Sequence, residues 1–78
     1  MMVDSVVSLK NLLPGQFGEV FRLEGRPEDV HRLEEFGLGR GTRIEMFRAG
    51  NPCIVRMGSN KFCLRLDRAL DVLVRPAG

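Results

Sequence analysis

The stretch CIVRMGSNKFCLRL, from Cys53 to Leu66, decides the fold class. On both sides of a Gly58-Ser59-Asn60 turn every second residue is apolar, which is the pattern of two strands that each bury one face. A pairing of Met57 with Phe62 puts the apolar side chains on one side of the hairpin. These side chains belong to Cys53, Val55, Met57, Phe62, Leu64 and Leu66. The stretch therefore predicts an antiparallel β-hairpin.

The same alternation extends outward from the hairpin in both directions. It predicts further strands over residues 16–24, 42–48 and 71–75, with turns between them. In the first of these strands Phe17, Phe21 and Leu23 share one parity, so we expect them on the buried face. Val20 breaks the polar parity of this strand, and Gly18 is expected to mark a bulge.

One short helix is expected over residues 27–36. It begins with a proline, whose fixed φ suits the first helical position, and Gly37 supplies a left-handed stop. Val30, Leu33 and Phe36 recur every three positions and form one apolar stripe. A separate helical turn behind Ser8 is expected to plug the core. The predicted core contains Leu33, Phe36, Ile44, Val55, Leu64 and Val72.

These elements predict a mainly β fold, a small five-stranded SH3-like barrel with one short α-helix. A chain of 78 residues has room for one core, so we expect a single domain over residues 1–78. Most apolar residues of so small a domain are needed in its interior. Little of the chain remains to enclose an active site.

Charge and hydropathy exclude several classes of protein. Twelve basic and ten acidic residues are interspersed and give a formal net charge of +2, which does not support nucleic-acid binding. No apolar stretch approaches the roughly 20 residues that cross a bilayer, so no direct membrane insertion is expected. The first residues do not resemble a secretory signal. We therefore expect a cytoplasmic protein whose two cysteines stay reduced.

The residues that carry chemistry are too few for an enzyme. His31 is the one histidine and is expected on the solvent face of the helix, while Glu34 and Glu35 point about 100° apart and cannot form a facing acid pair. Cys53 and Cys63 fall on opposite faces of the hairpin, and no paired ligand spacing for a metal occurs. We expect no catalytic residue, no metal site and no cofactor.

The run from Leu33 to Ile44, LEEFGLGRGTRI, resembles the signature of the FeoA family, in which a helix ends in an apolar-Gly-apolar element before a Gly-Thr pair opens a strand. The turn at 50–52, the strand at 62–65 and the closing strand are also similar to family motifs, and the resemblance spans about 9–74. It implies an SH3-like barrel that assists a membrane ferrous iron transporter by touching its cytoplasmic G-protein domain. It implies no catalytic residue.

The helix and the turn after it are the candidate partner-binding surface. Leu38 and Arg40 lie on this turn and offer an apolar anchor beside a cation, with Arg32 and Glu35 facing outward from the helix. In the alternative, Leu38 caps the core and Arg40 is only solvated. A second function also stays open, that of a metal-responsive sensor using Cys63, His31 or acidic side chains, similar to the C-terminal SH3-like domain of iron-dependent repressors. Weak self-association is left open as well.

Overall fold

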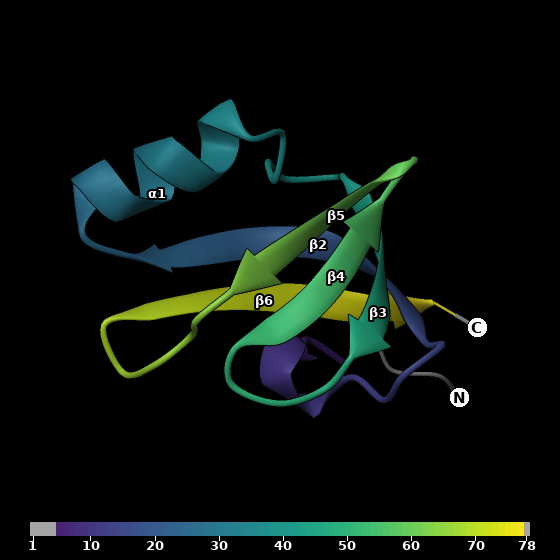
Figure 1. Ribbon diagram of the computed structural model, residues 1–78. Helices are drawn as coiled ribbons and strands as arrows, with labels where there is room; N and C mark the ends of the chain where they lie inside the picture. Colours follow the sequence, from purple (N-terminus) through teal and green to yellow (C-terminus); the bar gives the residue numbers. More distant parts are fainter. Residues whose placement is uncertain (1–4, 78) are drawn as a thin grey trace.

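The computed structural model describes residues 5–77 as one strongly bent antiparallel sheet with a single α-helix (Figure 1). The sheet order is β1-β6-β2-β3-β4-β5. The elements are β1 (Val7–Ser8), the 3-10 turn η1 (Leu9–Asn11), β2 (Phe17–Gly25), α1 (Pro27–Glu35), β3 (Arg43–Arg48), β4 (Cys53–Met57), β5 (Asn60–Leu64) and β6 (Leu70–Ala77). The expected mainly β fold with one short helix is confirmed.

The described part of the chain has six strands where five were expected. The extra strand, β1, pairs Val7 with Val74 and Ser8 with Leu73 on β6. A strand of two residues is too short to show an alternation, so the sequence pattern could not reveal it. The Ser8 hydroxyl then accepts a hydrogen bond from the Lys10 N–H and caps η1, as predicted.

The buried face of β2 is not the one that the sequence pattern predicted. Val20 is buried, whereas Phe17 and Phe21 are half-exposed. The bulge lies between Val20 and Arg22 and not at Gly18, so Phe21 is the extra residue and the parity changes there. Leu23 thereby packs against the core while both phenylalanines lie on the outer face.

The hairpin of β4 and β5 has the predicted faces in a different register. Met57 pairs with Asn60, and Val55 pairs with Phe62, so the pairing is shifted by two residues from the expected one. A shift of two keeps every side chain on its face. The turn contains only Gly58 and Ser59, and Gly58 has a φ of 63°, which fits a two-residue type II′ turn.

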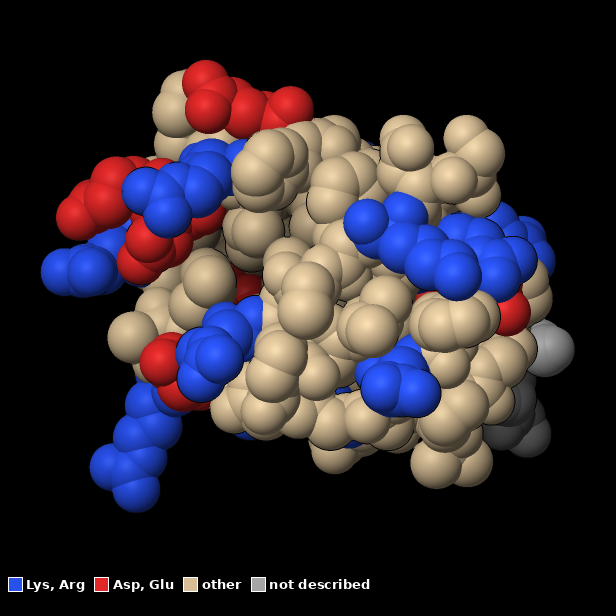
Figure 2. All heavy atoms as spheres, viewed as in Figure 1, with Lys and Arg blue, Asp and Glu red and all other residues tan. Residues whose placement is uncertain are grey.

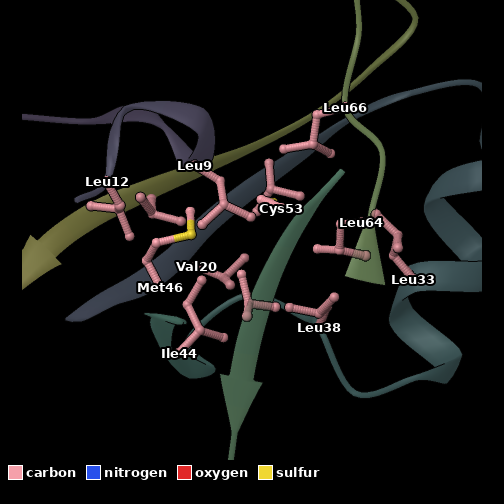
Figure 3. Packing of buried hydrophobic residues seen from close by; sticks show 13 residues of the cluster. Leu9, Leu12, Val20, Leu33, Leu38, Ile44, Met46, Cys53, Leu64 and Leu66 are labelled. Carbon is pink, nitrogen blue, oxygen red and sulfur yellow. The ribbon is translucent and has the colours of Figure 1, made fainter. Parts of the chain in front are cut away.

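The core lies between the bent sheet, η1 and α1 (Figure 3). The buried residues are Leu9, Leu12, Val20, Leu33, Leu38, Ile44, Met46, Cys53, Val55, Leu64, Leu66, Val72 and Val74. Five of the six predicted core residues are among them. Phe36 is the exception, because its side chain is 52% exposed.

Candidate partner-binding surface

The C-terminal end of α1 explains why Phe36 is exposed. The Gly37 N–H donates to the Glu34 carbonyl over 2.9 Å, and the Leu38 N–H donates to the Leu33 carbonyl over 3.0 Å. These two bonds, with a φ of 99° at Gly37, define a Schellman motif. In this motif the residue after the glycine packs against the last turn of the helix, so Leu38 joins Leu33 in the core.

Leu38 is 0% exposed, so the expectation that it offers an apolar anchor to a partner is wrong. The alternative, in which it caps the core, holds for this residue. The exposed apolar side chain at the helix end is Phe36, whose ring centroid lies 5.8 Å from that of Phe62 on β5. Met57 lies against the neighbouring Gly37. We call Phe36, Phe62 and Met57 the Phe36 patch.

The other three predicted contact residues are exposed but are divided between two surfaces. Arg32 and Glu35 remain on the solvent side of α1, and Glu35 lies 3.2 Å from the His31 ring in an i, i+4 pair. The Arg40 guanidinium lies 5.2 Å above the centre of the Phe21 ring on β2. The sequence prediction therefore grouped residues that the Schellman turn separates.

Two shallow hollows open on the outside of the sheet. One has a volume of about 290 Å³, lies between α1 and β2, and is lined by Phe21, Arg22, Leu23, Val30, Glu34 and Arg40. The other has a volume of about 360 Å³ and is lined by Phe17, Arg43, Ile44, Glu45, Arg56 and Gly58. Neither resembles a deep enclosed ligand site. Both have arginine at their rims.

Charge is divided across the surface (Figure 2). Acidic side chains lie over α1, at the upper left of the view, with basic side chains among them. A group of basic side chains lies at the opposite end, where Figure 1 shows β3 and the tip of the β4–β5 hairpin. On this face the end with α1 therefore carries both signs of charge, whereas basic side chains predominate at the other end.

The two cysteines occupy different environments, as the hairpin pattern predicted. Cys53 is buried and Cys63 is exposed on the opposite face. Burial raises the pKa of the Cys53 thiol above its usual value, so this thiol stays neutral. Within residues 5–77 no three histidine, cysteine or acidic side chains lie together in a way that could hold a metal ion. No helix in that part of the chain is long and apolar enough to span a membrane.

The family model of the FeoA domain matches residues 7–76. The chain belongs to the FeoA family. Members of this family are accessory proteins associated with ferrous iron transport. No curated protein matched the chain in a sequence search.

Solved FeoA structures share the fold. The crystal structure of an iron uptake regulatory protein (FeoA) aligns with a TM-score of 0.82 at 28% identity, covering 94% of this chain and all of the other. The solution structure of FeoA from Chlorobium tepidum gives 0.79 at 26% identity, covering 88% of this chain and 69% of that one. Iron(II) transport protein A from Clostridium thermocellum gives 0.71 at 26%, with coverages of 85% and 45%.

The sequence contains a signal for the exposed Phe36 that the periodicity argument overlooked. A glycine at the helix end followed at once by an apolar residue is typical of a Schellman motif, and it assigns the inward position to Leu38. Phe36, directly before the glycine, is then the helix cap and turns outward. No comparable signal in the sequence pairs Phe36 with Phe62.

Proposed function

We propose that this FeoA-family chain assists ferrous iron uptake by binding the cytoplasmic G-protein domain of a membrane ferrous iron transporter. Membership of the family supports a role in ferrous iron transport. The Phe36 patch supports a role through binding. Phe36 is 52% exposed, so this 78-residue fold lacks the free energy that full burial of the ring would contribute. That energy is recovered when a partner covers the ring.

The surroundings of Phe36 have the composition of a binding hot spot. Its ring lies beside that of Phe62, so the two present a continuous apolar area that is larger than one side chain. Arg32 precedes Phe36 by one helical turn and is exposed, and Glu35 is its immediate neighbour. An aromatic anchor bordered by charged residues is the usual arrangement of an interface centre and its rim.

Ferrous iron uptake by cells tests this proposal. Cells that produce the transporter but lack this chain would receive the wild-type gene, Phe36→Ser or Leu13→Ser. Leu13 is 68% exposed and precedes β2, away from α1, so it controls for the loss of an exposed apolar side chain. We expect Phe36→Ser to leave uptake at the level of cells without the protein, and Leu13→Ser to restore it. Full uptake with Phe36→Ser would contradict the proposed contact.

No structural observation favours the alternative function of a metal sensor. His31 is engaged with Glu35 on the helix surface, and Cys63 lies on the outer face of β5. We predict that anaerobic titration calorimetry with ferrous iron shows no tight site. A single site with a Kd near or below about 1 μM would contradict this prediction and revive the sensor.

A further inference from the structure

A second surface, separate from the Phe36 patch, carries cations stacked on aromatic rings. On the outer face of β2 the Phe21 ring has Arg40 and Arg75 over it, with guanidinium carbons 5.2 and 4.9 Å from the ring centre. On the same strand Phe17 has Arg43 over it at 4.7 Å. Phe17 and Phe21 share this face because they have the same parity before the β2 bulge, and the bulge turns Leu23 inward after it.

The same face continues across β3, β4 and β5. Phe17 pairs with Glu45, which in turn pairs with Arg56, and Arg56 pairs with Lys61, so all four lie on one side of the sheet. The Phe47 ring has the Lys61 ammonium 3.8 Å from its centre and the Arg56 guanidinium at 5.4 Å. We call these three rings and the five cations over them the cation–aromatic face.

The cations of this face have few acidic partners in the protein. Arg56 is 3.7 Å from Glu45, but Arg40, Arg43, Arg75 and Lys61 form no ion pair with any residue in the range 5–77. The Nε atom of Arg75 is buried and has no hydrogen-bond partner there. Within residues 5–77, four of the five cations on this face are therefore not neutralised by an ion pair.

Stacking also prepares these cations for carboxylates. A guanidinium held over a ring by a cation–π contact still has N–H groups that do not face the ring, and those donors match a carboxylate bidentately. Its side chain is already held, so less conformational entropy is lost on binding. The hollow of about 360 Å³ with Arg43 and Arg56 at its rim is large enough for an acidic side chain.

We propose that the cation–aromatic face binds an acidic protein segment, with a carboxylate entering the hollow between Arg43 and Arg56. A protein fits better than a phosphate polymer or an anionic bilayer because Glu19 and Glu45 lie within the face. Glu19 pairs across the strands with Arg43 and Arg75, where it would repel an unbroken row of phosphates. Separate carboxylates on a folded or extended segment can avoid these positions.

Fluorescence anisotropy with a labelled peptide tests the proposal. The peptide is a 12-residue segment in which glutamate alternates with leucine, and its matched control has glutamine at the glutamate positions. We expect the acidic peptide to bind the full chain in low salt, to lose affinity as salt rises, and the glutamine peptide not to bind. Equal binding of the two peptides, or no binding of the acidic one, would overturn the proposal.

Two double variants of the chain test whether the acidic peptide binds at the hollow. Replacing Arg43 and Arg56 together by glutamine should weaken binding at least about tenfold, because both donors at the hollow are lost. The variant with Lys10→Gln and Arg68→Gln loses the same charge from exposed positions outside the face and should bind within about twofold of wild type. Equal losses in the two double variants would show that only net charge matters and would overturn the proposal.

One variant is expected to bind the acidic peptide more tightly than the wild-type chain does. Glu45→Gln removes the carboxylate that competes for Arg56, so we expect binding to tighten by about two- to fivefold, the size of one exposed ion pair. A loss of affinity in this variant would contradict the assigned hollow.

Tighter binding of the full chain to phosphatidylglycerol vesicles or a single-stranded oligonucleotide than to the acidic peptide would overturn the choice of a protein partner. None of these outcomes depends on the Phe36 patch, so the proposed function is tested separately.

Discussion

At the scale of single residues, Leu33 connects the helix to the sheet. It is almost fully buried and points from α1 toward Leu64 of β5 (Figure 3). Leu33→Ala is expected to lower the free energy of unfolding by about 2 to 5 kcal/mol, because a cavity forms where the helix meets the core. Val30→Ala, at a half-buried position on the same helix, should cost less. Chemical denaturation measures both, and an unchanged midpoint for Leu33→Ala would remove α1 from the core.

The two cysteines give a second prediction at this scale. Cys63 is exposed, whereas burial raises the pKa of Cys53 and keeps its thiol neutral. Iodoacetamide should therefore modify Cys63 first in the native protein, which mass spectrometry of the modified peptides can follow. The raised pKa of Cys53 also makes the free energy of unfolding depend on pH. The unfolded chain ionises Cys53 at a lower pH than the native chain does, so the free energy of unfolding falls as the pH rises past the usual pKa of a thiol. Equal rates at the two cysteines would contradict the assigned burial.

At the scale of elements, the Schellman turn sets the end of α1 and thereby the position of Phe36. Gly37 has a φ of 99°, and a β-carbon added there would lie 3.3 Å from the terminal methyl of Met57. Gly37→Ala is therefore expected to lower the free energy of unfolding by about 1 to 2 kcal/mol. Gly39 provides a matched control, since its φ is not positive and nothing lies within 4 Å of the β-carbon position. Thermal unfolding of both variants makes the comparison. A loss of stability in Gly39→Ala as large as in Gly37→Ala would contradict it.

The elements also show where sequence reasoning succeeds. The faces of the hairpin from Cys53 to Leu64 were predictable because every second residue of both strands is apolar, and an error of two residues in the register changes no face. The buried face of β2 was not predictable, because the extra residue at Phe21 changes the parity within the strand. A bulge depends on the pairing with β6, and a local pattern contains no information on that pairing. The prediction that Phe36 is buried failed for a different reason. A helical repeat of three does not show where the cap begins, whereas the pair Gly37-Leu38 after it does.

At the scale of the whole molecule, the surface was less predictable than the core. The cations are dispersed along the sequence, yet the fold places five of them over three aromatic rings of the sheet. Arg40 and Arg75 are far apart in sequence and meet only because both lie over Phe21. Of the predicted contact residues, Leu38 is buried, Arg40 belongs to the cation–aromatic face, and Arg32 and Glu35 remain beside Phe36.

We propose above that this FeoA-family chain acts by binding the transporter's cytoplasmic G-protein domain through the Phe36 patch. The most direct measurement is the affinity of the purified chain for that purified domain, with and without guanine nucleotide, by titration calorimetry. We predict saturable binding that Phe36→Ser weakens by about tenfold or more, as expected for a hot-spot aromatic, while Leu13→Ser leaves it unchanged. Circular dichroism must show that both variants are folded. No binding by the wild-type chain in either nucleotide state, or equal affinity of the folded Phe36→Ser variant, would contradict the claim.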